Sequence, residues 1–325
     1  MTADSLPDVT LVVPLRDEAA SIDALAASIA DLVIAPAAVV FVDGGSLDNT
    51  VEILRPWTAT HPSWSVIEAG PATPGRGRNI GIEHASTTWI ALADAGMIVD
   101  RYWLARLVEA AGEHPDAGLV YGHRDVSPRG FLGRCIALAY VTPARPTDRG
   151  PVRDRFIACC LVRRDAWERV GGIPDLRAAE DGIFLRRLEA DGVKAVIAPE
   201  ARVVSELEPT LAVVFRKFRL YSRVNVEAGE QSRWHYGVAA QWLVAAPFLV
   251  AGIRRRRLLA IPALAFGARA AKSIAVRREG KPMSFVANPV RLAGVGVVLL
   301  TCDAATFAGW LDAVRDRRRA RAVRG

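Results

Sequence analysis

The sequence predicts an α/β fold with a mostly parallel sheet, followed by a C-terminal region of apolar helices. Over about the first hundred residues, short apolar runs alternate with helical patterns in the order β-α-β-α-β-α-β, which is typical of a doubly wound sheet. Polar turns rich in glycine and acidic residues follow several of these runs. Beyond Thr210 the character changes to long apolar stretches separated by arginines.

The first two predicted strands end in polar turns. Val9 to Val13 is an apolar run closed by Pro14, and a helical pattern starts near Ile22. Val39 to Val42 is the second run, and Asp43-Gly44-Gly45-Ser46 follows it. Because glycines let the backbone approach a ligand closely, this turn is suited to binding.

The stretch from residue 75 to 104 organises the α/β part. Ser65 to Ala69 is the third predicted strand, and Gly-Arg-Gly-Arg-Asn opens a short helix after it. Trp89 to Ala93 is short and apolar, so it reads as a buried strand. Asp94 and Gly96 lie just beyond its carboxyl end, where open α/β sheets bind ligands.

The pattern is less regular after the fourth strand. From His123 to Arg155 periodicity fades, and we interpret this segment as a long functional connection. The remaining predicted elements are a helix over Asp100–Ala111, a strand over Leu119–Tyr121, a strand over Phe156–Val162, a helix over Arg164–Val170, a helix beginning near Glu180 and a strand over Val193–Ile197.

Three apolar runs follow a basic helical stretch over Leu211–Val226. Tyr236 to Ile253 is nearly free of charge and is long enough for a marginal membrane span. Leu258 to Ala268 and Leu292 to Cys302 are shorter and fit interfacial or re-entrant helices equally well. Buried helices of a soluble domain are the alternative. If the run from residue 236 starts in the cytoplasm and forms a simple hairpin, Arg254 to Arg257 would lie on the outer side of the membrane. Because basic residues usually stay on the cytoplasmic side, no topology is predicted.

The net charge of +7 is unevenly distributed. From Arg254 onward there are 16 Lys/Arg against 4 Asp/Glu, whereas residues 1–253 carry 26 against 31. The basic region is interleaved with apolar stretches, which favours anionic lipid headgroups over nucleic acid as its partner. We therefore expect two domains, a catalytic one over 1–230 and a membrane-associated helical one with a basic tail over 231–325.

The cysteines and the N-terminus suggest a compartment. The four cysteines form no CxxC pair, and adjacent Cys159 and Cys160 are poor disulfide partners, which suits a reducing environment. The first residues show no basic segment followed by a long apolar one, so no secretory signal is visible. We expect a protein at the cytoplasmic membrane whose α/β domain faces the cytoplasm.

Each acidic residue at a predicted strand or helix end has an ordinary explanation. Asp43 fits a simple turn, and Glu180 with Asp181 fits charges that complement a helix dipole. Asp94, directly after an apolar strand, is harder to explain in this way. Together with Arg78 these residues indicate a ligand site.

Five segments, in order and spacing, resemble the family-2 glycosyltransferases over about residues 8 to 230. The resemblance implies a GT-A fold (Rossmann-like), a nucleotide-diphosphate sugar donor and inversion at the anomeric carbon. The segments are Pro14-Leu-Arg-Asp-Glu18, Val42-Asp43-Gly-Gly-Ser46-Leu-Asp48-Asn-Thr50, Gly77-Arg78-Asn79-Ile-Gly81, Asp94-Ala-Gly96 and Gly171-Gly-Ile-Pro-Asp175 with Glu180-Asp181.

Carried over by position, the resemblance implies a donor site. Pro14, Glu18 and Asp43 would hold the nucleoside, and Arg78 would lie on the donor. Asp94 would occupy the first position of the Asp-x-Asp metal motif and bind a divalent cation, Mn²⁺ or Mg²⁺. A cation or arginines would stabilise the negative charge that builds on a diphosphate leaving group.

The same resemblance implies the catalytic group. Asp181 matches the acidic residue that acts as base, and Glu180 stands beside it. A carboxylate in this place can take the proton that an acceptor hydroxyl loses as it attacks.

Two departures from the family pattern bear on the reaction. Gly96 replaces the second Asp of Asp-x-Asp, so either Asp94 and the phosphates hold the cation or cation dependence is weak. The processive Gln-x-x-Arg-Trp motif is not intact, and Glu230-Gln-Ser-Arg233-Trp234 is its nearest match. Addition of a single sugar is therefore favoured.

The sequence thus predicts a membrane-associated inverting glycosyltransferase, hexosyltransferase-like, that acts on a lipid-linked or cell-envelope glycan acceptor. Two alternatives remain. A sugar-phosphate nucleotidyltransferase shares the fold class but would show a Gly-rich phosphate loop where this chain reads Pro14 to Glu18. A catalytically silent membrane scaffold with the same fold would be consistent with Gly96.

Overall fold

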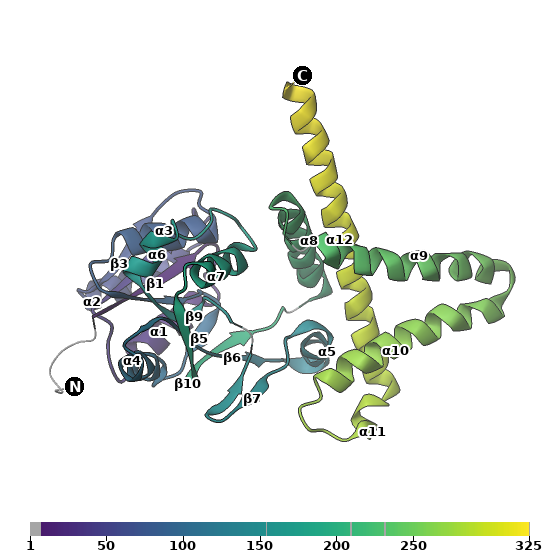
Figure 1. Cartoon of the computed structure of the whole chain (residues 1–325), viewed down its shortest axis with the longest axis horizontal. Helices are drawn as coiled ribbons and strands as arrows, with labels where there is room; N and C mark the ends of the chain where they lie inside the picture. The colour runs from purple at the N-terminus through teal and green to yellow at the C-terminus, as the bar shows by residue number, and fades with distance from the viewer. Residues whose placement is uncertain (1–7, 154, 209, 231, 325) are drawn as a thin grey trace. The chain divides into compact units, whose positions relative to one another are not determined.

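The chain divides into two compact units, each described here by itself. The computed structural model describes residues 8–153, 155–208, 210–230 and 232–324, without the side chains of 232–234 and 320–324. The α/β unit comprises Met1–Val126 and Ala144–Glu206, and the helical unit comprises Ser127–Pro143 and Leu207–Gly325 (Figure 1). The predicted division of roles at residue 230 remains a prediction.

The α/β unit is built on an eight-stranded sheet in the order β3-β2-β1-β4-β9-β6-β10-β5. Strands β3, β2, β1 and β4 are parallel, and β9 pairs antiparallel with both β4 and β6, so β6 runs in the direction of β4. Since β10 and β5 pair antiparallel, one of them also runs this way, so six of the eight strands share one direction, which confirms the mostly parallel sheet. The strands are β1 (Val9–Leu15), β2 (Ala38–Asp43), β3 (Trp64–Glu68), β4 (Trp89–Ala93), β5 (Met97–Val99), β6 (Ala117–Ser127), β9 (Cys159–Arg163) and β10 (Lys194–Glu206).

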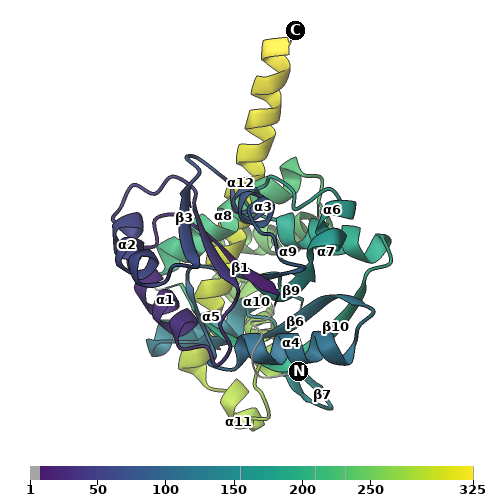
Figure 2. The ribbon, with the colours of Figure 1, turned by 90° about the vertical axis from the view of Figure 1, so that its left-hand side faces the viewer.

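Helices cover both faces of this sheet (Figure 2). Alternation along β1 explains the two layers, because Leu11 and Val13 pack in one buried cluster and Val12 packs in the other. The first cluster includes residues of α1 and α4, and the second includes residues of α3, α6 and α7. The helices of the unit are α1 (Ile22–Ala30), α2 (Thr50–Thr60), α3 (Pro74–Glu83), α4 (Trp103–Glu113), α6 (Arg164–Arg169) and α7 (Glu180–Ala190).

The prediction of an irregular connection from His123 to Arg155 is wrong. The segment contains the end of β6, helix α5 (Gly130–Tyr140) and a hairpin of β7 (Arg145–Thr147) with β8 (Gly150–Val152). Helix α5 belongs to the helical unit, where its apolar residues share a core with α10 and α12. Local periodicity could not reveal this element, because its stability depends on partners more than a hundred residues away.

Among the residues that the structure describes, the helical unit holds three helices that are long and apolar enough to cross a membrane. The qualifying stretches are His235–Arg254, Arg256–Val276 and Pro289–Arg319. The runs predicted as short therefore lie in longer helices, which continue past the charges that seemed to bound them. The elements are α8 (Leu211–Glu227), α9 (Ser232–Arg254), η1 (Arg256–Leu259), α10 (Ala260–Val276), α11 (Met283–Val286) and α12 (Pro289–Arg324).

Two sequence observations fall partly or wholly outside the described residues. The expectation that the chain has no secretory signal depends on the first seven residues, which lie outside the described range. The partial match to the processive motif, from Glu230 to Trp234, lies mostly outside it, because Gln231 and the side chains of Arg233 and Trp234 are not described.

Candidate active site

Helix α3 is the element on which the candidate site is assembled. Thr73 caps it by accepting a hydrogen bond from a first-turn amide. A Cβ at Gly75 would lie 1.9 Å from the carbonyl oxygen of Pro174, and one at Gly81 would lie 2.4 Å from Val12. Only glycine therefore allows α3 to touch both the sheet and the loop before α7, and this explains the Gly-rich spacing.

Arg78, on α3, gathers three carboxylates. Its side chain is only 3% exposed. Nη2 lies 2.7 Å from Asp94 Oδ1, and Nη1 lies 3.1 Å from Glu180 Oε1 and 3.7 Å from Asp181 Oδ1. Four of the residues singled out from the sequence thus meet at one point, at the end of β4 and the start of α7.

Asn79 fixes the loop that leads into α7. Its amide donates to the carbonyl of Ile173 at 2.7 Å and accepts from the amide of Ile173 at 2.9 Å and from Trp167 Nε1 at 3.0 Å. Sequence reasoning gave Asn79 no role of its own. Its position beside Arg78 was the available signal, because neighbouring helical residues point in different directions and can hold two segments at once.

The three carboxylates outnumber the one guanidinium, and Asp181 responds to the excess. Burial raises the pKa of Asp181 to about 7; Arg78 opposes the rise, and the charges of Glu180 and Asp94 add to it. Among the described residues, the buried Oδ1 of Asp181 has no hydrogen-bond partner. Asp181 therefore combines a pKa near neutrality with a buried oxygen that makes no hydrogen bond within the described ranges and lies 3.7 Å from Arg78, on a side chain that is 29% exposed.

Arg78 stays charged in this setting. Burial alone would lower the pKa of Arg78, but the charges of Asp94, Asp181 and Glu180 outweigh it and hold the pKa above its usual value. In this structure, Arg78 is engaged by protein carboxylates; its predicted contact with a donor is not tested.

Pro14 and Glu18 lie at the carboxyl end of β1. Pro14 is the register partner of Val42 in β2. Glu18 Oε2 accepts a hydrogen bond from Ser21 Oγ at 2.5 Å. Burial raises the pKa of Glu18, Ser21 opposes this, and the nearby charge of Asp94 adds to the rise. Glu18 thus belongs to the same acidic edge of the sheet as Asp94.

Asp43, at the end of β2, is 4% exposed and shapes its own turn. Its carboxylate accepts hydrogen bonds from the amide of Gly45 at 3.1 Å and from the hydroxyl of Ser46 at 2.5 Å. The simple-turn interpretation describes these contacts fully. Its predicted role in holding a nucleoside is not tested.

The residues at the Asp-x-Asp position could hold a cation through one side chain. Asp94 Oδ1 is bonded to Arg78, which leaves Oδ2 as the oxygen for a metal. Gly96 offers no ligand, and a Cβ there would meet only Glu18 Oε2, at 4.0 Å. Over the described ranges, no group of three or more His, Cys, Asp or Glu side chains has metal-binding geometry. Mg²⁺ often binds through one or two carboxylates plus substrate phosphates, so this donor set suits a cation that arrives with a diphosphate.

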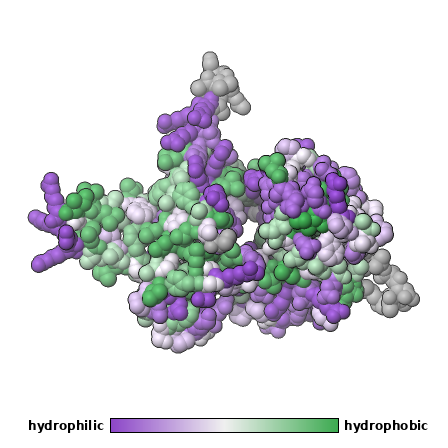
Figure 3. Space-filling view, turned by 180° about the vertical axis from the view of Figure 1, so that it is seen from behind, coloured by the Kyte–Doolittle hydropathy of each residue, from purple (hydrophilic) through white to green (hydrophobic). Residues whose placement is uncertain are grey.

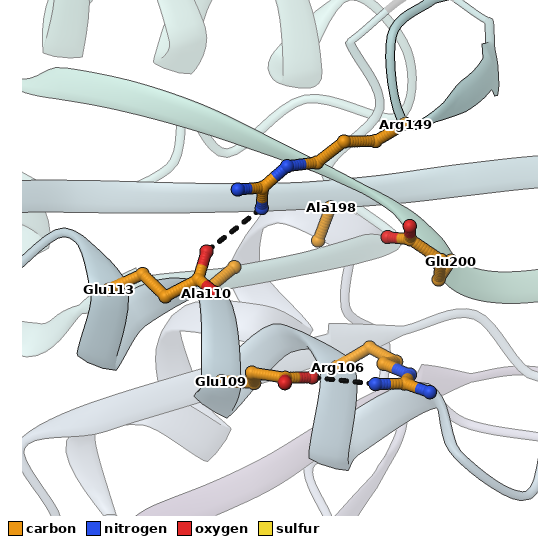
Figure 4. Close-up of a pocket in the computed structure, with 7 residues that line it drawn as sticks. All are labelled: Arg106, Glu109, Ala110, Glu113, Arg149, Ala198 and Glu200. Carbon is orange, nitrogen blue, oxygen red and sulfur yellow. Dashed lines mark hydrogen bonds and ion pairs between the residues drawn. The ribbon is translucent and has the colours of Figure 1, made fainter.

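A cavity of about 210 Å³ lies elsewhere in the α/β unit (Figure 4). Arg149 pairs with Glu113 and Arg106 pairs with Glu109, each at 2.8 Å. None of the candidate site residues lines it. The lining residues are Arg106, Glu109, Ala110, Glu113, Arg149, Ala198 and Glu200.

Comparison with solved structures shows a protein of the same fold. A mannosyltransferase from Pyrobaculum calidifontis, solved in complex with GDP-Man and Mn²⁺, superposes with a TM-score of 0.58 at 21% identity. The match covers 96% of this chain and 88% of that one, and it establishes a shared fold. No curated protein sequence matches the chain.

The family model described as Glycosyl transferase family 2 matches residues 10–171. This range includes Arg78 and Asp94 and ends in the loop before α7, so Glu180 and Asp181 lie outside it. Over residues 10–171 the resemblance noted from the sequence is confirmed; the last segment, Gly171 to Asp175 with Glu180 and Asp181, lies beyond the match except for its first residue. Through residues 10–171 the chain belongs to glycosyl transferase family 2.

Proposed function

We propose that the protein is an inverting glycosyltransferase that moves one hexose from a nucleotide-diphosphate sugar to a lipid-linked or cell-envelope glycan acceptor. The observation that carries the proposal is the oxygen of Asp181, which is buried, without a hydrogen-bond partner among the described residues, and part of a carboxyl group whose pKa is about 7. A group of this kind suits general-base catalysis near neutral pH.

In the proposed reaction, the acceptor hydroxyl oxygen attacks the anomeric carbon while the bond from that carbon to the diphosphate breaks. The hydroxyl proton passes to Asp181, and the nucleoside diphosphate leaves with the bonding electrons. Attack from the face opposite the leaving group inverts the anomeric carbon. Arg78 and Glu180 hold Asp181 in place, since all three belong to one buried ion cluster.

The leaving group requires positive charge near Asp94. A divalent cation bound there would neutralise the developing charge on the diphosphate. Asp94 Oδ2 would hold it, and Glu18 lies at the same edge of the site. Pro14, Glu18 and Asp43 stand at neighbouring strand ends, which supports the proposal that they bind the nucleoside.

The helical unit supports the choice of acceptor. Three helices apolar enough to cross a membrane are joined to a transferase domain, so an acceptor that is itself held in the membrane would be available at the site. We place the protein at the cytoplasmic membrane, where nucleotide sugars are accessible to a domain facing the cytoplasm.

The proposal is tested by measuring donor binding and transfer with the purified full-length protein. UDP, GDP and dTDP sugars are screened with Mn²⁺, Mg²⁺ or a chelator, starting with GDP-mannose because the structural neighbour binds it. Cation-dependent binding and turnover of one donor are expected. Binding that survives chelation would remove the metal from the mechanism, and binding without turnover would favour the silent scaffold.

A further inference from the structure

We propose that α9 and α10 cross the lipid bilayer as a hairpin, with Arg254–Arg257 among the headgroups of the far leaflet. The inference goes beyond the transferase activity and does not depend on it. It concerns the helical unit alone and follows from exposure, length and charge.

The two arms of the hairpin present apolar side chains to their surroundings. Only 17% of the most apolar stretch of α9 and 22% of that of α10 are buried. Figure 3 shows hydrophobic surface over the projecting hairpin and hydrophilic surface at its tip. The exposed apolar side chains include Leu243, Val244, Val250, Ile253, Ile261 and Leu264, between 44% and 81% exposed.

These arms have no polar face. From Trp242 to Ile253 and from Leu258 to Ala268 every residue is apolar or glycine. A helix that lies on a membrane surface needs one charged side, whereas a helix that is apolar all round is surrounded by apolar material. The hairpin therefore fits the hydrocarbon interior and not its surface.

The length of α9 and the tip agree with a crossing, and the second arm has 11 charge-free residues, about 16 Å, before Arg269, whose charge Asp303 neutralises. The charge-free run of 18 residues from Tyr236 to Ile253 spans about 27 Å at 1.5 Å per residue, close to the roughly 30 Å of a hydrocarbon core. A Cβ at Gly252 would lie 2.3 Å from Leu259, so the arms meet closely at the tip. The four arginines at the turn are exposed and can extend to lipid phosphates.

Helix α12 differs from the two arms. Its most apolar stretch is 39% buried, and its second half is paired with the charged helix α8. Arg219 Nε lies 2.6 Å from Asp312, and Arg223 Nη2 lies 2.9 Å from Asp316. These pairs hold the charged second half of α12 against α8, beyond its most apolar stretch.

The hairpin is tied to α12 by a neutralised charge, at Trp242 within the charge-free run of α9 and at Arg269 just past that of α10. Asp303, on α12, is 1% exposed and accepts hydrogen bonds from both Nη atoms of Arg269 on α10, at 2.6 and 2.8 Å. Trp242 Nε1 on α9 donates to the same carboxylate at 3.0 Å. Pairing within the protein lowers the cost of holding these charges next to lipid.

The distribution of basic residues orients the hairpin. Residues 216–235 contain five Lys/Arg and residues 277–296 contain four, against the four at the tip. The base therefore carries more positive charge than the tip, and the positive-inside tendency places the base in the cytoplasm. The four arginines of the tip, taken alone, oppose a hairpin with its base in the cytoplasm. The larger number of basic residues at the base outweighs them.

The test is cysteine labelling of the full-length protein in the membranes of expressing cells. Arg256→Cys probes the tip, and Lys281→Cys, in the exposed loop after α10, probes the base. A membrane-impermeant maleimide is applied to intact spheroplasts and to inverted vesicles. The tip is expected to react at least about tenfold more in spheroplasts and the base at least about tenfold more in vesicles, because the bilayer separates the two thiols.

The wild-type chain is the background control, since its four cysteines are all buried. Arg254→Cys repeats the tip measurement if Arg256→Cys fails to accumulate in membranes. Reaction of tip and base from the same face would overturn the crossing. Protection of the tip on both faces would also overturn it, and would point to a tip held within lipid or covered by a second copy of the chain.

Discussion

Each unit of the molecule contains a cluster in which an arginine pairs with acid and one member is buried, Arg78 in the α/β unit and Asp303 in the helical unit, and the two clusters are balanced differently. In the α/β unit, Arg78 faces Asp94, Glu180 and Asp181, so three carboxylates share one guanidinium. In the helical unit, Asp303 is matched by one arginine and one indole N–H. The first cluster has an excess of acid, and the second has none.

The difference separates a reactive arrangement from a structural one. In the first cluster, burial raises the pKa of Asp181, Arg78 opposes the rise, and the unmatched charges of Glu180 and Asp94 add to it, so this carboxylate holds its proton more tightly. Where each charge has its partner, the pair fixes the helices and leaves no group ready to accept a proton. The comparison predicts how the clusters respond when one member is removed.

The largest effect is expected from Arg78→Ala. Removing one partner of a buried ion pair costs about 3–5 kcal/mol, and here three acidic groups would be left to repel one another. We expect a large loss of thermal stability and of donor binding, measured by unfolding in detergent and by calorimetry with the nucleotide sugar. Arg78→Lys, which keeps the charge without the planar fork, is the matched variant and should restore part of both.

Wild-type stability in Arg78→Ala would contradict the view that this arginine holds the cluster together. Full recovery in Arg78→Lys would show that charge alone is required, without the two-pronged geometry that joins Asp94 to Glu180.

The second effect concerns Asp181→Asn. If Asp181 is the base, turnover should fall by about 100-fold or more, with little change in donor affinity, because the amide keeps the shape and loses the proton acceptor. Rates of sugar transfer and donor dissociation constants are measured on the same preparation. Glu180→Gln is the neighbouring control, and equal losses in both variants would argue against a distinct role for Asp181.

A smaller effect is expected in the balanced cluster. Asp303→Asn leaves Arg269 without its counter-ion, but that side chain is 26% exposed, so we expect a loss of stability of about 2 kcal/mol. Donor binding should be unchanged. The double variant Arg269→Met with Asp303→Leu should recover most of the stability, as measured by thermal unfolding in detergent; no recovery would mean that the pair does more than hold the helices.

The pH dependence follows from the raised pKa of Asp181. Below about pH 7 the carboxyl is protonated and cannot act as a base, so kcat/KM should fall by about tenfold for each pH unit below 7.

The free energy of unfolding depends on pH in the opposite direction. The pKa of Asp181 in the folded state lies above its unfolded value of about 3.9, so stability declines as the pH rises from the unfolded pKa to the folded one. Asp181→Asn should flatten that decline. A rate profile flat from pH 5 to 8 would remove Asp181 from the rate-determining proton transfer.

Much of the α/β unit could be predicted from sequence, because its strands are short apolar runs with their polar residues at the ends. Arg78, Asp94, Glu180 and Asp181 could be singled out for the same reason. That Arg78 joins the other three could not, since the contact with Glu180 spans 102 residues of sequence. Helix α5 was missed because its partners are equally distant.

The smallest effect is expected from Gly96→Asp, which restores the second carboxylate of the family's metal motif. A Cβ at this position meets only Glu18, at 4.0 Å, so the side chain should fit without a clash. The added charge beside Asp94 and Glu18 should strengthen cation binding several-fold, because divalent ions bind more tightly as carboxylate ligands are added. Without the cation the same charge adds to the acidic excess and should weaken donor binding. Titration with Mn²⁺ in the presence of donor measures the first effect, and donor binding in chelator measures the second.

Gly96→Asn is the matched variant that adds bulk without charge. If Asp and Asn change cation affinity equally, or neither does, a cation does not bind at Asp94, and the positive charge on the donor must come from other groups.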